Sequence, residues 1–264
     1  MRASPHWLDA LSLRVETRLD ASLPFPATAT ESQVFERIWA MLPEGRGVNR
    51  VGSGPGGCFL KGQALPLSWA LRHWFRPPGI PREVEALTRL RGAGIRVPRV
   101  LGFGMLRRWG LLRRSLLLLE HISDAEDLAQ CLGRRSSDEE RLRVFEAVGR
   151  AVARMHAVSF HHRNLSARNL LVRDGVSGPE VLVIDCPRAE WARFAPRTAF
   201  LRRDDRLRLV RSALRCGASD AEVRRLLEAL GADEVERIVE LARDSIRRRR
   251  SRPLRARAWL ILGV

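Results

Sequence analysis

The stretch that decides the fold is His162-Arg163-Asn164-Leu165-Ser166-Ala167-Arg168-Asn169-Leu170-Leu171-Val172. Its first half is polar and reads as a loop, whereas the residues from Asn169 onward form the apolar run of a short strand. A turn-rich segment, residues 174–179, separates this run from a second apolar run at 181–184, and the pattern predicts a β-hairpin. Asp185 follows the hairpin, sixteen residues after Asn169. Polar residues of potential chemical importance therefore flank the hairpin on both sides.

This order matches the sequence pattern of protein kinases. The loop agrees with the catalytic motif H-R-D-L-x-x-x-N at every defined position except the Asp, which is Asn164 in this chain. Asp185 stands where the metal-binding Asp of the D-F-G motif belongs. Under this interpretation Asn169 and Asp185 supply oxygen ligands to Mg²⁺, and Asn164 takes the position of the catalytic base.

Lys61 is the only lysine among 47 basic residues. It lies on the second of two expected strands, where a compact ammonium group can hold the α- and β-phosphates of a nucleotide. Such a lysine needs a glutamate on a nearby helix, and both Glu83 and Glu85 are available in the helix that begins at Pro81. At 100° per residue Glu83 shares the apolar face of Leu87, whereas Glu85 points about 200° away. We therefore expect Glu83 to pair with Lys61.

Two further segments have the composition of a nucleotide site. The turn before Lys61 contains Gly52, Gly54 and Gly56, whose backbone amides can approach phosphate groups, although a plain flexible turn explains these glycines equally well. After the last strand of the first half, Glu120 and Ile122 flank a hinge whose backbone groups would bind the adenine edge.

The chain resembles the Kdo and heptose kinases of lipopolysaccharide synthesis. The resemblance covers roughly residues 48–215, and it includes the strings around Lys61 and Glu83, the segment 94–101, the loop 162–172 and Val183-Ile184-Asp185. It implies a bacterial, cytoplasmic kinase that uses ATP and Mg²⁺ to phosphorylate a sugar of a lipopolysaccharide inner-core-like glycolipid.

Asn164 departs from that family, because an amide cannot accept the proton of the attacking hydroxyl as a carboxylate does. Loss of a general base typically costs about 10²–10⁴-fold in rate. His161 and His162 are possible replacement bases, but packing against the loop backbone is the commoner role of such histidines. The alternative to an active kinase is therefore a pseudokinase that binds nucleotide or acts as a scaffold.

The remaining sequence predicts an α+β chain with a protein-kinase-like two-lobed fold. We expect an N-terminal helical extension (1–45, with helices near 7–19 and 31–42), an N-lobe with a small antiparallel sheet and one main helix (46–121), and a mostly helical C-lobe with a basic tail (122–264). The segment 95–104 reads as a strand. Capping boxes are expected where Ser137 precedes Glu140 and where Ser219 precedes Glu222.

Composition limits the compartment and the partners. The net charge of +17 predicts attraction to anionic partners. Basic and aromatic residues occur together at 67–78 and in the C-terminal tail, which favours an anionic membrane surface, whereas no recognised nucleic-acid motif accompanies the charge and nucleic acid is an unlikely partner. The N-terminus lacks the apolar run of a signal peptide, and the four cysteines have no metal-site spacing. We expect a cytoplasmic protein that binds peripherally at the inner face of the inner membrane.

Overall fold

The computed structural model describes residues 13–19, 30–42, 47–51, 57–72, 79–135 and 137–250. These residues form two compact units. The first contains the described residues up to Asp124 together with Val183–Ala189, and the second contains Ala125–Leu182 and the described residues from Glu190 onward.

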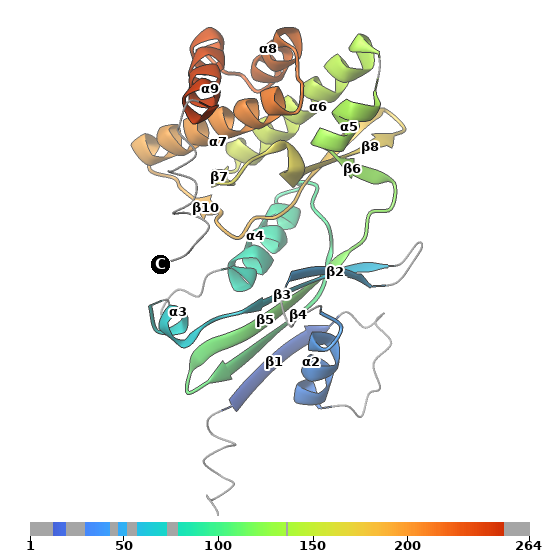
Figure 1. The fold of residues 1–264 in the computed structure, drawn as a ribbon, viewed down its shortest axis with the longest axis vertical. Coiled ribbons are helices and arrows are strands. Elements are labelled where there is room, and N and C mark those ends of the chain that lie inside the picture. The colour runs from blue at the N-terminus through green and yellow to red at the C-terminus, as the bar shows by residue number, and fades with distance from the viewer. Residues whose placement is uncertain are drawn as a thin grey trace, which may run out of the picture. The chain divides into compact units, whose positions relative to one another are not determined.

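The first unit is built on an antiparallel five-stranded sheet in the order β1-β4-β5-β3-β2 (Figure 1). Its strands are β1 (Leu13–Leu19), β2 (Gly47–Val51), β3 (Cys58–Ala64), β4 (Val100–Arg108) and β5 (Leu111–Glu120). Its helices are α2 (Glu31–Trp39), α3 (Leu67–Arg72) and α4 (Ile80–Gly92).

Helices α2 and α4 lie on opposite faces of this sheet (Figure 1). Phe35 and Ile38 of α2 share one buried core with Leu60 of β3 and with Leu116 of β5. Because successive strand residues point to opposite faces, Lys61 points away from this core and toward α4. The apolar packing on one face thus determines the orientation of the only lysine on the other.

The expected helix near residues 7–19 is wrong over its described part. Residues 13–19 form β1, which pairs with β4 from Leu13 opposite Arg108 to Leu19 opposite Gly102. The sequence Leu-Arg-Val-Glu-Thr-Arg-Leu alternates apolar and charged residues with a period of two, broken only at Thr17, and this period indicates a strand. The N-terminal segment thus adds an edge strand to the sheet. The second expected helix is present as α2, which starts with a capping box at Thr30.

The expected strand at 95–104 begins later, at Val100. Ile95 and Val97 are buried but lie in irregular backbone. Pro98 has no N–H to donate to a sheet, so the regular ladder starts only after it. The expected hairpin at 169–184 is present as β8 (Leu170–Gly175) and β9 (Gly178–Val183).

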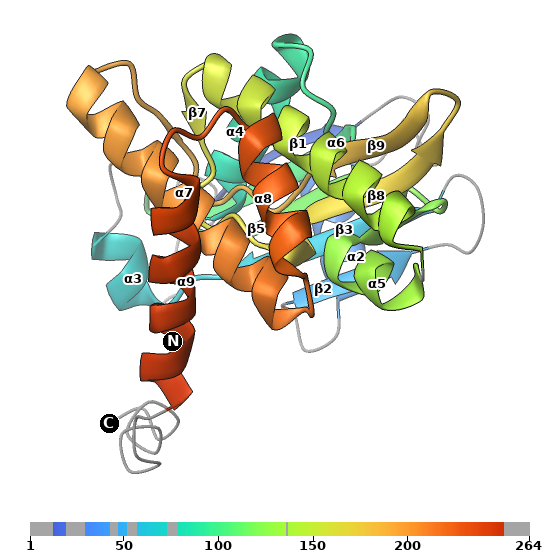
Figure 2. The ribbon, with the colours of Figure 1, turned by 90° about the horizontal axis from the view of Figure 1, so that it is seen from above.

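The second unit is mostly helical. Its helices are α5 (Leu128–Arg134), α6 (Asp138–Ala157), α7 (Ala195–Arg215), α8 (Asp220–Ala229) and α9 (Val235–Arg250), and its short strands, besides β8 and β9, are β6 (Ala125–Asp127), β7 (Phe160–His161) and β10 (Glu190–Trp191). Helix α8 packs on α6, and α9 packs on α7 (Figure 2). Gly149 permits the close approach of α6 to α8, because a Cβ there would lie 2.5 Å from the carbonyl oxygen of Leu226.

The two expected capping boxes have different outcomes. Ser219 and Glu222 form the predicted box at the start of α8. Ser137 is the N-cap of α6, but its side chain makes no capping hydrogen bond, so that prediction is wrong. Three acidic residues in the first turn of α6, Asp138, Glu139 and Glu140, interact favourably with the positive end of the helix dipole instead.

Within the described ranges, no helix combines the length and the apolar character that are needed to cross a bilayer.

Candidate functional site

Lys61 makes two ion pairs in the first unit. Its Nζ donates to Oε2 of Glu83 at 2.7 Å and to Oδ1 of Asp185 at 2.5 Å. Strand β3 supplies the lysine, α4 supplies Glu83, and Asp185 lies in the segment that follows β9. Glu85 points elsewhere and pairs with Arg89 at the surface. The structure therefore pairs Lys61 with Glu83, as the helix geometry predicted.

The three charged side chains Lys61, Glu83 and Asp185, here called the Lys61 triad, differ in how far they are exposed to solvent. Burial alone would lower the pKa of Lys61, but the carboxylates of Glu83 and Asp185 outweigh it and raise that pKa above its usual value. Burial raises the pKa of Glu83, and Lys61 opposes this effect. The side chain of Glu83 is 2% exposed, whereas that of Asp185 is 38% exposed. Glu83 is thus a fixed partner of Lys61, and Asp185 is the carboxylate that solvent or a ligand reaches.

Two of the three backbone N–H groups of the predicted hinge already donate to backbone carbonyls. The backbone N–H of Glu120 donates to the carbonyl of Arg99, and that of His121 donates to the carbonyl of Gly57. Among the described residues, the N–H of Ile122 has no such acceptor. Of the three residues of the predicted hinge, Ile122 is therefore the one whose N–H has no backbone acceptor. The predicted phosphate-binding Gly52, Gly54 and Gly56 lie outside the described residues.

In the second unit, one buried carboxylate anchors the backbone at the start of the motif loop, residues 162–172. Asp205 of α7 is fully buried, and its two oxygens accept the backbone N–H groups of His162 and Arg163, each at 2.8 Å. Arg163 has a φ of 60°, which is an uncommon backbone conformation for a residue with a side chain. The hydrogen bonds to Asp205 stabilise this conformation and so fix the start of the loop.

Asn169 closes the loop. Its Nδ2 donates to the backbone carbonyl of Asn164 at 2.8 Å, so its Oδ1 is left as an acceptor or metal ligand. Within the described ranges, the side chain of Asn164 makes no hydrogen bond to another residue, and it is half-buried. The loop therefore presents one amide oxygen at Asn169 and one uncommitted side chain at Asn164.

An ion-pair network ties the loop to the segment that follows it. The Arg163 guanidinium lies 3.1 Å from Oε2 of Glu190, and Arg197 of α7 binds the same carboxylate at 2.9 Å. Glu190 also pairs in the sheet with His161, in the β10–β7 ladder. The position of Arg163 is therefore determined by groups from three different elements.

Neither candidate replacement base is suited to that role. His162 is fully buried, and its Nδ1 accepts the N–H of Asn164 at 3.3 Å. His161 is also fully buried, and burial, followed by the positive influence of His156, lowers its pKa to about 4. The His162 ring thus packs against the loop backbone, which is the common role of such a histidine, whereas the His161 ring lies beside that of His156.

Sequence reasoning missed Asp205 and Glu190. The signal for Asp205 was present, because it lies four residues after Leu201 and four before Leu209, on the buried face of α7. An acid on an apolar helical face needs internal partners, and here these are the backbone amides of the loop. Glu190 carries no comparable signal, because its partners come from distant positions in the chain.

In the first unit, Lys61 is a positioned cation beside an accessible carboxylate, that of Asp185. In the second unit, Asn169 keeps an amide oxygen and Asn164 keeps an uncommitted polar side chain. Carboxylate and amide oxygens are hard ligands of the kind that Mg²⁺ prefers.

Comparisons with known proteins agree with this chemistry. The chain is 34% identical over 103 residues to the 3-deoxy-D-manno-octulosonic acid kinase of Vibrio vulnificus (strain YJ016), which covers 38% of this chain and 42% of the relative. It is 32% identical over 133 residues to the corresponding kinase of Photobacterium profundum (43% and 53%). A RIO-type serine/threonine-protein kinase, Rio1 of Haloferax volcanii, is 29% identical over 166 residues (63% and 50%). The chain thus spans about half the length of these curated relatives.

A solved structure supports the fold. The structure described as WaaP in complex with acyl carrier protein matches with a TM-score of 0.59 at 23% identity, and the match covers 85% of this chain and 92% of that one. The predicted kinase-like α+β fold is thereby confirmed.

The family model described as "Lipopolysaccharide kinase (Kdo/WaaP) family" matches residues 57–230, which is more than half of the chain. This range contains Lys61, Glu83, the loop 162–172 and Asp185. The chain belongs to the lipopolysaccharide kinase (Kdo/WaaP) family.

Proposed function

We propose that this chain is an ATP- and Mg²⁺-dependent kinase that phosphorylates a sugar hydroxyl of a lipopolysaccharide inner-core-like glycolipid. The observation that carries the proposal is the position of Lys61 Nζ between the carboxylates of Glu83 and Asp185. The relatives that bear the name of a sugar-acid kinase support the acceptor class.

Each residue has a separate task in this proposal. Lys61 holds the α- and β-phosphates, and Glu83 keeps the lysine extended. Asp185 and Asn169 hold Mg²⁺, and the N–H of Ile122 binds the adenine edge. ATP with Mg²⁺ supplies the phosphoryl group and neutralises its charge. Glu120 contributes as part of the hinge backbone, and Gly52, Gly54 and Gly56 would cover the phosphates with their amides.

Asn164 sets the rate in this proposal. The transition state of phosphoryl transfer is loose and needs little early deprotonation of the hydroxyl. The uncommitted amide of Asn164 can orient the hydroxyl without accepting its proton. The enzyme is therefore expected to be slow compared with a relative that carries Asp. A pseudokinase that binds nucleotide without transfer is the second candidate, and the same Asn164 favours it.

The decisive experiment is phosphate transfer from γ-labelled ATP to a Kdo-containing lipid A precursor by the purified full chain. Transfer that requires Mg²⁺ and disappears in Lys61→Met supports the kinase. Nucleotide binding without transfer supports the pseudokinase, provided that an active Kdo kinase phosphorylates the same acceptor preparation. A protein that neither binds ATP nor transfers phosphate would contradict both.

We further propose that the protein acts peripherally at the cytoplasmic face of an anionic membrane. Helix α3 exposes Leu67, Trp69 and Leu71 at 44%, 47% and 51%. Arg72 in its last turn adds a basic group, and apolar anchors beside basic residues bind anionic leaflets. The test is co-sedimentation with anionic vesicles: binding should decrease with salt and with Trp69→Ser, and equal binding to neutral vesicles would contradict it.

A further inference from the structure

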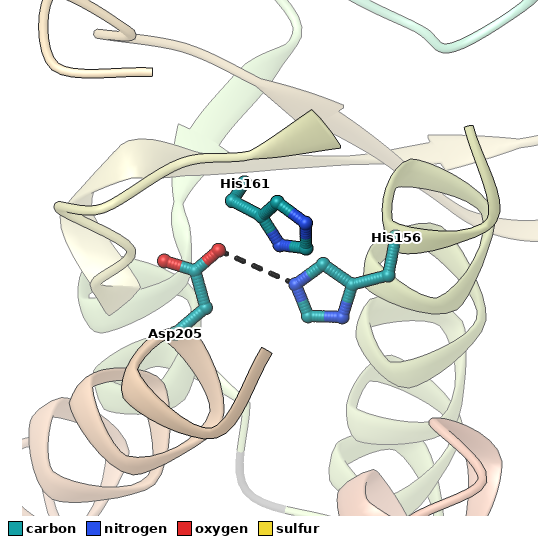
Figure 3. Close-up of side chains that lie close together, drawn as sticks. All are labelled: His156, His161 and Asp205. Atoms are coloured by element: carbon teal, nitrogen blue, oxygen red, sulfur yellow. Dashed lines mark hydrogen bonds and ion pairs between the residues drawn. The ribbon is translucent and has the colours of Figure 1, made fainter. Parts of the chain in front are cut away.

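The second unit contains a buried cluster of three potential metal ligands (Figure 3). His156 comes from the end of α6, His161 from β7, and Asp205 from α7. Their exposed fractions are 3%, 0% and 0%. The nucleotide residues proposed above do not include any of the three.

Most of the imidazole nitrogens in this cluster lack a partner. Nε2 of His156 lies 3.3 Å from Oδ2 of Asp205. Among the described residues, neither ring nitrogen of His161 nor Nδ1 of His156 makes a hydrogen bond of good geometry, and the backbone of Ala192 interacts only weakly with the His161 ring. Buried polar groups are nearly always satisfied, so a fully buried imidazole with two unsatisfied nitrogens calls for a missing partner such as an ion or a water molecule.

The spacing of the ligand atoms fits one small ion. All three ligand atoms lie within 4.8 Å of one another. Zinc binds imidazole nitrogen and carboxylate oxygen at about 2.0–2.2 Å, so two ligands of one tetrahedral ion are about 3.3–3.5 Å apart. The His156–Asp205 distance of 3.3 Å already has this value. Figure 3 shows the His161 ring beside the other two side chains, with its ligand nitrogen within the same 4.8 Å of theirs.

The chemistry of the donors selects the kind of ion. Two imidazoles and one carboxylate suit Zn²⁺ and similar transition metals, whereas Mg²⁺ and Ca²⁺ prefer oxygen ligands. Arg202, whose guanidinium binds the backbone carbonyl of His156 at 3.0 Å, also disfavours an ion that is held by charge alone. The lowered pKa of His161 keeps its ring neutral at pH 7, as metal coordination requires.

We propose that His156, His161 and Asp205 bind one Zn²⁺ ion as three protein ligands. Asp205 also accepts the backbone N–H groups of His162 and Arg163, so the ion would be joined to the start of the motif loop through one carboxylate. The site is structural in this proposal. The ion would fix Asp205 and so stabilise the start of the loop, and it takes no part in phosphate chemistry. It does not depend on the proposed kinase activity.

The test uses the untagged full chain, purified without chelator and then analysed for metal content. One equivalent of zinc per chain is expected. After removal of zinc with EDTA, titration with Co²⁺ alone should produce the visible absorption of tetrahedral cobalt with one-to-one stoichiometry, and added Zn²⁺ should abolish it. Mg²⁺ should produce no displacement.

His161→Phe removes both ring nitrogens and keeps an aromatic ring of similar shape. It should weaken Co²⁺ binding by at least about 100-fold, because even the loss of an outer partner of a metal ligand costs 10–100-fold. His121→Phe is the matched control, since His121 is a partly buried histidine of the first unit, and it should bind Co²⁺ like the wild type. Equal binding by His161→Phe, or no stoichiometric cobalt spectrum in the wild type, would overturn the proposal.

Thermal melting gives a second readout, and its main comparison uses only the wild-type protein with and without zinc. Zinc should raise the melting temperature of the wild type, and EDTA should reverse the rise, because the ion binds only the folded chain. In EDTA, His161→Phe should melt at or above the wild-type temperature, since it buries no unsatisfied nitrogen. A wild type without zinc response beside a more stable His161→Phe would identify the cluster as a water-filled or strained core instead, and the zinc site would be rejected.

Discussion

The Lys61 triad of the first unit matches the kinase pattern, whereas the motif loop of the second unit departs from it at one residue. The triad has every expected group: a lysine, a buried helix glutamate and an accessible aspartate within hydrogen-bonding distance of the lysine. The loop keeps its backbone anchors, with His162 and Arg163 bonded to Asp205 and Asn169 bonded to Asn164, but it lacks the catalytic carboxylate. The three charged groups of the triad therefore match the kinase pattern, whereas the loop differs from it at Asn164.

Phosphate binding and proton acceptance in a kinase depend on separable interactions. Holding phosphates requires buried and paired charges, and a change in one charge leaves the others uncompensated. Proton acceptance requires one accessible atom on a loop whose shape comes from backbone hydrogen bonds. Asp and Asn have nearly the same shape, so Asn164 changes the chemistry of the loop without disturbing its fold.

The largest effect is expected from Lys61→Met. It removes the only positioned cation of the triad, so phosphate transfer should decrease by about 10²–10³-fold, the usual cost of losing one stabilising charge in an active site. Steady-state transfer assays at saturating ATP measure it. Glu85→Gln is the control, because Glu85 lies on the same helix but pairs with Arg89 at the surface. Normal transfer by Lys61→Met would show that the triad is not the phosphate site.

The next effect should be a gain, from Asn164→Asp. A carboxylate at this position can accept the hydroxyl proton, and transfer to the glycolipid acceptor should increase by about 10²-fold. Asn164→Ala separates the contribution of the base from that of orientation, and it should be slower than the wild type. If Asn164→Asp and wild type transfer at equal rates, another group is the base and the loop is not impaired.

A smaller effect is expected from Glu190→Gln. This change breaks the ion pairs of Glu190 with Arg163 and Arg197. Exposed or half-exposed pairs contribute about 0.2–1 kcal/mol, so the transfer rate should fall by roughly 1.4–5-fold. Glu180→Gln is a matched control: Glu180 pairs with Arg173, and the exposed fractions of the two glutamates are 21% and 23%. A loss of the same size in both variants would mean that Glu190 does not position the loop.

The last of these effects is on stability instead of transfer rate, and it concerns the second unit as pH falls. The pKa of His161 is about 4 in the folded chain and about 6.5 in the unfolded chain. Between pH 6.5 and 4 the unfolded chain binds a proton that the folded chain does not, so stability decreases as pH falls through this window. Melting temperatures in EDTA measure the decrease, and His161→Phe should reduce it. An identical pH profile in both proteins would refute the assignment to His161.

Much of the fold and of the Lys61 triad was predictable because the signals are local. Glu83 was distinguished from Glu85 by helical periodicity alone, and the structure agrees. The hairpin and the Ser219 cap follow from turn and capping residues that are close in sequence. The proposed roles of these residues in binding ATP and Mg²⁺ still depend on the experiments above.

The errors and omissions have physical causes. The short alternating run of β1 was taken for a helix because its strand partner, β4, is far away in the sequence. The capping signal at Ser137 was as good as that at Ser219. The Ser137 side chain nevertheless makes no capping hydrogen bond, and acidic residues in the first turn of α6 stabilise the start of the helix instead. Glu190 and His156 act through long-range contacts, which no local pattern reveals. Asp205 did have a local signal, its position on the apolar face of α7, but its partners in the loop are equally distant in the sequence.

We expect the chain to bind ATP through the Lys61 triad although its motif loop lacks the catalytic carboxylate. The direct measurement is calorimetric titration of the full chain with ATP in the presence of Mg²⁺, with Lys61→Met and Asn164→Asp in parallel. We predict that the wild type and Asn164→Asp bind with affinities within about 3-fold of each other, a difference below 1 kcal/mol, and that Lys61→Met binds at least about 10-fold more weakly. No binding by the wild type at millimolar ATP, or equal binding by Lys61→Met, would contradict the claim.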